Sequence, residues 1–335
     1  MKKSWFSFAN QRICHSRVAT QNTKSFDFLR ETMKKQFLIF LVILVAAPAF
    51  SQQLPQFTQY MYNTISINPA YAGSRDAFSI IGLHRSQWAD FEGAPTTQTL
   101  SINSPLSNNK IGLGLSIIND NAGYENYTYA YGDFAYRIDL SADVSLRMGL
   151  KAGASYYNLE EELFTEPEVM NDPFFQDRLN RWTPNFGLGF YLSSQNWYIG
   201  ASAPKLINNN NNEFNEYLAL EQVHYYLTGG YVFDLSDNVK LRPTTLVKMT
   251  KGAPLSVDLT ATAIFNEKFY LGGSYRIDDA VGAFLDVQVF NGFRAGYAYE
   301  YPISDIRPYT SGSHEILLIY EIRLKNTRYK SPRFF

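Results

Sequence analysis

Residues 314–324, HEILLIYEIRL, show the pattern that decides the fold of this chain. Hydrophobic side chains occupy alternate positions on one face, namely Ile316, Leu318, Tyr320, Ile322 and Leu324. The opposite face carries Glu315, Glu321 and Arg323. Because successive side chains of a β-strand point to opposite faces, one face is expected to meet an apolar medium and the other a polar lumen or core.

About fourteen segments of this kind follow one another, and they predict an all-β fold, a transmembrane antiparallel β-barrel with an irregular N-terminal segment. In residues 144–156, Leu146 and Leu150 alternate with Arg147 and Lys151, and charges inside a strand are tolerated where they point into the lumen. The expected strands lie near residues 76–87, 94–104, 110–119, 124–138, 143–157, 182–193, 196–203, 222–235, 239–250, 254–266, 268–277, 280–290, 292–302 and 313–325.

The lengths of the connections separate a barrel from a water-soluble β-sandwich, which would show the same alternation. If the first strand rises from the periplasm, every second connection is periplasmic, and these connections are all short. The two longest gaps, 158–181 and 204–221, both fall on the extracellular side. Outer-membrane barrels have short periplasmic turns and longer extracellular loops, so the connections favour the barrel.

Residues 33–51 have the features of a secretory signal peptide. A basic start at Lys34 and Lys35 precedes the apolar run 37–47, and Ala49 and Ser51 supply small residues at a cleavage site. The apolar run is shorter than the roughly 20 residues that a transmembrane helix needs. We therefore expect export to the outer membrane of a diderm bacterium.

The signal divides the chain into parts. Residues 1–32 precede it and are interpreted as an extension from a start codon assigned too early. Cleavage would leave a mature chain that begins at Gln52. We expect an irregular segment at 52–75, on the periplasmic side or in the lumen, then the barrel at 76–325 and a C-terminal tail at 326–335.

The reactive residue types give no support for an enzyme, a metal site or a cofactor. The one cysteine, Cys14, precedes the signal, so the mature chain would carry no thiol. His84, His224 and His314 are isolated, without the spacing of paired metal ligands. No nucleophile or phosphate-loop motif is present. The net charge of −1 predicts no attraction to nucleic acid, and an aromatic content of 16% suits a barrel surrounded by outer-membrane lipid.

The expected extracellular loop at 158–181 is acidic. It is a candidate partner loop, although a solvated loop without a partner would have the same composition. A cationic or calcium-bridged partner would suit it, but the spacing does not match an EF-hand. Its acidic residues are Glu160, Glu161, Glu162, Glu166, Glu168, Asp172 and Asp177.

Several motifs together carry a family resemblance. The first block joins QFTQYM at 56–61 to NPAYAG at 68–73. The second joins RSQW at 85–88 to GAPTT at 93–97, and GLG at 112–114 opens a third. Along the whole mature chain, the sequence resembles the PorP/SprF family. The resemblance implies an outer-membrane barrel of the type IX secretion system, which exports and displays adhesins that carry a C-terminal signal domain.

Some of these residues form a candidate structural or partner-contact motif: Asn68, Pro69, Ala70, Tyr71, Gly73, Arg85 and Trp88. Proline fixes its own φ and favours an extended Asn68, and small neighbours allow packing against a barrel wall, although a plain strand-entry turn would look the same. Because side chains alternate between the two faces of a strand, Arg85 is expected to point inward. Trp88 is interpreted as an interfacial anchor, with a partner contact as the alternative.

Three functions remain open from the sequence. The first is a non-enzymatic component of the secretion apparatus with a plugged lumen, which supports export, surface retention or assembly of adhesins and gliding motility. Its partners would be other type IX components and an exported adhesin. The second is an outer-membrane channel for hydrophobic solutes. The third, an outer-membrane hydrolase, lacks any triad-like set of residues.

Overall fold

The structure, a computed structural model, describes residues 55–75, 77–106, 109–165, 169–170, 180–207 and 222–323. The expected signal peptide, the residues before it and the C-terminal tail lie outside the described residues. The first three residues of the predicted N-terminal segment do so as well.

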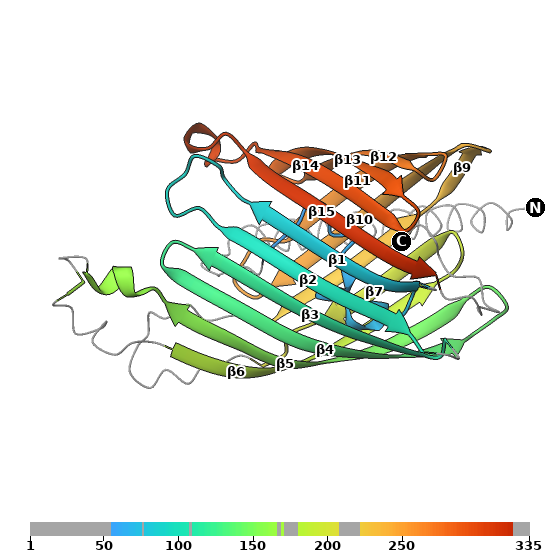
Figure 1. Cartoon of the computed structure of the whole chain (residues 1–335), viewed down its shortest axis with the longest axis horizontal. Coiled ribbons are helices and arrows are strands. Elements are labelled where there is room, and N and C mark those ends of the chain that lie inside the picture. The colour runs from blue at the N-terminus through green and yellow to red at the C-terminus, as the bar shows by residue number, and fades with distance from the viewer. Residues whose placement is uncertain are drawn as a thin grey trace, which may run out of the picture. The chain divides into compact units, whose positions relative to one another are not determined.

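Antiparallel strands make up nearly all of the regular structure (Figure 1). They are β1 (Ala77–Ser86), β2 (Thr96–Pro105), β3 (Ile111–Ala122), β4 (Glu125–Asp139), β5 (Ser145–Leu159), β6 (Asn180–Ser193), β7 (Trp197–Ala203), β8 (His224–Tyr231), β9 (Phe233–Ser236), β10 (Val239–Thr250), β11 (Ser256–Phe265), β12 (Phe269–Arg276), β13 (Ala280–Phe290), β14 (Phe293–Pro302) and β15 (Ser313–Arg323). Short 3-10 helices are η1 (Thr64–Ser66), η2 (Pro69–Tyr71), η3 (Glu161–Thr165) and η5 (Arg307–Tyr309). Among the described residues, no helix is both long and apolar enough to cross a membrane.

The strands close into a barrel because consecutive strands pair, apart from β8 and β9, which both pair with β10, and because β15 also pairs with β1. The segment expected at 222–235 is divided at Val232 into β8 and β9. Both pieces pair with β10 in the same register, since Gly230 lies opposite Thr244 and Phe233 lies opposite Leu241. Val232 instead donates its N–H to the carbonyl of Asn196. With β8 and β9 taken as one strand, the fifteen strands form a fourteen-stranded barrel, which confirms the predicted fold class.

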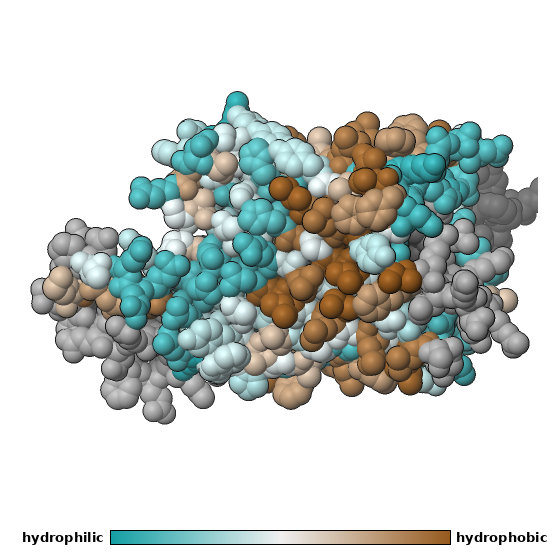
Figure 2. Space-filling view, viewed as in Figure 1, coloured by the Kyte–Doolittle hydropathy of each residue, from teal (hydrophilic) through white to brown (hydrophobic). Residues whose placement is uncertain are grey.

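The two faces of the wall differ as the period-two pattern predicts. On β5, Arg147 and Lys151 are buried inside, whereas Met148 and Leu150 are exposed outside. Apolar side chains gather in a band on the outer surface, with hydrophilic side chains toward both ends (Figure 2). This is the surface expected where outward side chains meet hydrocarbon.

The two ends of the barrel have unequal connections. The connections 140–144, 194–196, 237–238, 266–268 and 291–292 are short and lie at the end where β1 begins. The longer connections, from β5 to β6, from β7 to β8 and from β14 to β15, join strand ends at the other end of the barrel. In outer-membrane barrels these are the periplasmic and extracellular ends respectively.

Residues 55–75, which we call the plug, lie inside the barrel (Figure 1). Nearly every side chain from Phe57 to Ser74 is buried. The plug packs against the wall in two apolar clusters, one around Tyr60 and Leu317 and one around Tyr71 and Tyr191. The core of this protein is therefore the interface between the plug and the inner wall.

Candidate functional site

The plug runs the length of the lumen. At the extracellular end, Gln56 donates from Nε2 to Asp258 and to Ser256 at the start of β11. At the periplasmic end, Arg75 forms an ion pair of 3.0 Å with Glu321 near the end of β15. The chain thus descends through the barrel before β1 climbs back as the first strand.

A buried charge network fastens the upper part of the plug. Arg85, which is 1% exposed, lies 2.5 Å from Glu315 and 2.7 Å from Glu300. Glu315 also accepts the backbone N–H groups of Thr58 at 2.6 Å and of Gln59 at 3.1 Å. The inward orientation predicted for Arg85 is confirmed, and its role is to hold two carboxylates that bind plug backbone.

The network continues along the inner wall through Arg276 on β12. Arg276 donates from Nε to Asp258 at 2.7 Å and lies 3.4 Å from Glu300. The hydroxyl of Thr58 donates to Glu300 at 2.7 Å. A buried charge is stable only when paired and hydrogen-bonded, so each arginine depends on these carboxylates.

The motif at 68–73 docks on the lower wall. Asn68 Oδ1 accepts the N–H of Ala70 at 3.0 Å, and Asn68 Nδ2 donates to the carbonyl of Phe190 on β6 at 3.0 Å. Pro69 begins η2, and Tyr71 packs edge-on against Tyr191 with ring centroids 5.7 Å apart. These residues hold the plug in place and are not exposed to a partner.

Glycines make room for this docking. A Cβ atom on Gly149 would lie 2.2 Å from the nitrogen of Ala70, and one on Gly189 would lie 2.1 Å from Asn68 Oδ1. Gly73 has φ +63°, and a Cβ there would lie 2.7 Å from Gly112 Cα. The absence of side chains at these glycines therefore leaves the space in which plug and wall approach each other.

The middle of the plug is tied to the wall by further polar groups. Lys151 lies 2.8 Å from Asp133, with both side chains fully buried, and donates to the carbonyl of Ile65 at 3.2 Å. Arg242 donates to the hydroxyl of Tyr62 at 2.9 Å. The wall therefore holds the plug at top, middle and bottom.

A cavity of about 630 Å³ lies above the plug at the extracellular end, and we call it the vestibule. Its floor includes Pro55, Gln56, Arg85 and Arg276. Trp88 lies just past the end of β1 and lines this cavity, and its backbone N–H donates to Ser313 Oγ at 3.1 Å. That placement suits the partner-contact alternative for Trp88.

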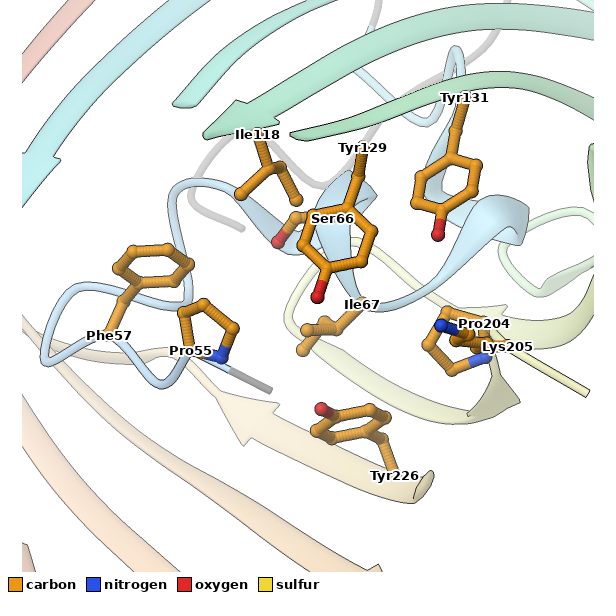
Figure 3. A pocket seen from close by; sticks show the side chains of 10 residues that line it. All are labelled: Pro55, Phe57, Ser66, Ile67, Ile118, Tyr129, Tyr131, Pro204, Lys205 and Tyr226. Carbon is orange, nitrogen blue, oxygen red and sulfur yellow. The ribbon is translucent and has the colours of Figure 1, made fainter. Parts of the chain in front are cut away.

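A smaller, mostly apolar cavity of about 40 Å³ lies below it, between Tyr129, Tyr131, Tyr226 and the plug (Figure 3). Lys205 reaches it because Pro204 and Lys205 are buried inside the barrel, where Asn185 donates to the carbonyl of Pro204 at 2.9 Å. Burial lowers the pKa of the Lys205 ammonium group to about 7.

The acidic loop is described only in part. Glu160, Glu161 and Glu162 lie at the extracellular end of β5, with Glu161 and Glu162 exposed. Glu166, Glu168, Asp172 and Asp177 lie outside the described residues.

The histidines lie apart from one another. His224 lines the vestibule, whereas the ring of His314 bonds Tyr297 at 2.6 Å and that of His84 bonds Ser86 at 3.3 Å. Among the described residues, no group of three metal-ligating side chains is present.

The sequence pattern of the family described as type IX secretion system membrane protein PorP/SprF matches residues 49–320. No curated protein matches the chain in sequence. Among solved structures, the outer membrane protein Omp33 of Acinetobacter baumannii overlays with a TM-score of 0.44 at 9% identity, covering 74% of this chain and 98% of that one. The NanC porin gives a TM-score of 0.40 at 10% identity, covering 73% of this chain and 100% of that one.

The family match covers most of the chain. It includes the plug, strands β1 to β14 with their connections, and most of β15. The motifs at 56–61 and 68–73 are the upper and lower anchors of the plug. The family pattern and the plugged barrel therefore describe the same part of the molecule, and the chain belongs to the PorP/SprF family of type IX secretion system membrane proteins.

Proposed function

We propose that this protein is a non-enzymatic outer-membrane component that supports export and surface retention of an adhesin-type protein. The observation that carries the proposal is the filled lumen. The barrel interior is occupied by its own residues 55–75, which buried ion pairs and close backbone contacts hold in place. Such a barrel is suited to present a fixed extracellular surface.

The partners follow from the family. A type IX membrane protein interacts with other components of that system. We propose that the short periplasmic turns meet those components and that the extracellular end meets an exported adhesin with a C-terminal signal domain. A contribution to gliding motility would follow from display of such an adhesin.

The alternative function is a channel for hydrophobic solutes. Fourteen strands can enclose a passage, but side chains and backbone of the plug take that space here. A closed barrel passes no ions, so the purified protein should give no steady conductance in a planar bilayer. Stable single-channel steps from the wild-type protein would favour the channel.

Two measurements on one deletion strain test the proposal. We expect the surface amount of one or a few large exported proteins to fall, with the rest of the outer-membrane composition unchanged. Whole-cell uptake of a hydrophobic solute should stay normal. If uptake falls while the exported proteins stay at normal levels, the secretion role is wrong.

A further inference from the structure

The vestibule has the size of a ligand site and faces the cell exterior. Its volume of about 630 Å³ lies within the range of about 300–1,000 Å³ that is typical of sites for small molecules. It is too small for a folded domain, so an exported partner could insert only a short segment. The plug forms the floor, and the ends of strands from both halves of the barrel form the wall.

The charges around the vestibule are unbalanced. The two arginines of the floor are already engaged by Glu315, Glu300 and Asp258. The remaining lining side chains include one lysine, Lys248, and one histidine, His224. Against these stand four further carboxylates, Asp120, Glu125, Asp278 and Asp279, of which Asp279 is itself paired with Arg276 at 3.1 Å. The wall therefore favours a cationic ligand.

One wall adds an aromatic surface. Tyr127 and Tyr129 occupy inward positions on β4 and line the vestibule, with parallel rings at 6.1 Å between centroids. A third ring, Tyr157 on β5, lies 4.8 Å from Tyr127. Ammonium and guanidinium groups bind tyrosine faces within about 6 Å of the ring centroid.

The chain itself contains an example of this contact. Lys205 Nζ lies 5.7 Å from the centroid of the Tyr129 ring, on the side of the smaller cavity. The same row of tyrosines therefore already receives one ammonium group below the vestibule. Above it, Tyr127 stands next to two carboxylates, those of Asp120 and Glu125.

We infer that the vestibule binds a short, extended, basic segment of the exported partner. A lysine or arginine of that segment would lie over Tyr127, between the carboxylates of Asp120 and Glu125. This inference rests on the proposed function, because only an exported protein brings such a segment to the extracellular end. The partner contact would then lie in the vestibule and not in the acidic loop at 158–181.

The test compares two charge-neutralising variants of the full-length protein in detergent. Asp120→Asn with Glu125→Gln removes two vestibule charges and keeps the side-chain oxygens that accept from Thr97 at 2.6 Å and from Tyr157 at 3.1 Å. Glu161→Gln with Glu162→Gln removes two charges from exposed residues of the acidic loop. Retention of heat-modifiable gel mobility shows that each variant is folded.

The probe is a fluorescent tetralysine peptide, with tetraglutamate and a neutral maltohexaose as comparisons. We expect tetralysine alone to bind, and the vestibule variant to weaken its binding at least tenfold while the loop variant stays within twofold of the wild type. Equal weakening in both variants, binding of the saccharide instead, or no binding of tetralysine would overturn the inference.

Measurements of the surface adhesin on cells distinguish a failure of this inference from a failure of the proposed function. If deletion of the protein lowers the surface adhesin but the vestibule variant retains it fully, the vestibule is not the contact and the secretion role stands. If deletion itself leaves the adhesin at normal levels, the proposed function fails.

Discussion

Gly149 on β5 lies so close to Ala70 of the plug that a Cβ atom on Gly149 would be 2.2 Å from the backbone nitrogen of Ala70. Backbone meets backbone at this contact, so no flexible side chain can move aside. The missing side chain of one strand residue thus sets the position of the plug.

We therefore expect Gly149→Val to expel the lower plug or prevent the barrel from folding. The cost should be about 3 kcal/mol or more, at the upper end of overpacking. Gly132→Val is the matched control, since a Cβ on this exposed β4 glycine would lie 3.9 Å from the nearest atom, the Ala152 carbonyl oxygen. Thermal loss of the folded gel band measures both, and equal stability of the two variants would contradict this role of Gly149.

Arg85→Met should destabilise the folded barrel by about 3–5 kcal/mol, because it leaves Glu300 and Glu315 with less compensation in a buried site. Arg137→Met breaks an ion pair with Asp139 that is more exposed to solvent and should cost about 0–1 kcal/mol. Adding Glu315→Gln to Arg85→Met should recover part of the loss. A denaturant titration of the detergent-solubilised protein checks this, and a double variant no better than the single one would argue against the pairing.

Leu318→Arg should impair barrel assembly, since this outward β15 side chain lies in the apolar band and an arginine at the membrane midplane costs about 2–4 kcal/mol. The same substitution at Gln98, outward on β2 near the extracellular end, should cost about 0–1 kcal/mol because the penalty falls toward the interface. Heat-modifiable gel mobility of outer-membrane fractions reports both. A larger defect for Gln98→Arg would mean that the band is misplaced.

Stability should rise from pH 7 to pH 9 through Lys205. Its pKa is about 7 when folded, against about 10.4 for an unfolded lysine. In this interval the unfolded chain binds a proton that the folded chain does not, so raising the pH favours the folded state. Lys205→Met should flatten this dependence, whereas Lys240→Met, on a partly exposed ion pair with Asp234, should not. Identical pH slopes for wild type and Lys205→Met would exclude the effect.

Gln56→Cys should react with a membrane-impermeant maleimide on intact cells, because Gln56 lines the vestibule. Ser141→Cys, on an exposed periplasmic turn, should react only after the outer membrane is opened. The opposite pattern would invert the direction of the plug and of the barrel.

The strands and their faces could be predicted because period two is a local property. The alternation of Leu146 and Arg147 requires no knowledge of what lies inside the barrel. Which connections share one end of the barrel likewise follows from counting strands. The alternation holds even at Val232, which is buried between exposed Tyr231 and Phe233, although the strand is divided there and the Val232 N–H bonds to the carbonyl of Asn196.

The contacts of the lumen could not be predicted in the same way. Gln56 meets Asp258, and Arg85 meets Glu300, across separations of about 200 residues that no pattern along the sequence encodes. Alternation along each strand marks the strand residues among them as inward, but it does not identify the residues that they contact. The small residues of the motif at 68–73 were a signal of packing against the wall, but they do not identify the wall residues that they contact.

The charge network also lies at the seam of the barrel. Arg85 belongs to β1, the first strand, and Glu315 to β15, the last, and the two strands pair with each other at these residues. Glu315 binds the plug backbone at the same time. The carboxylate of Glu315 thus joins the first strand, the last strand and the plug, and a barrel closed without the plug would bury this carboxylate with fewer hydrogen-bond donors.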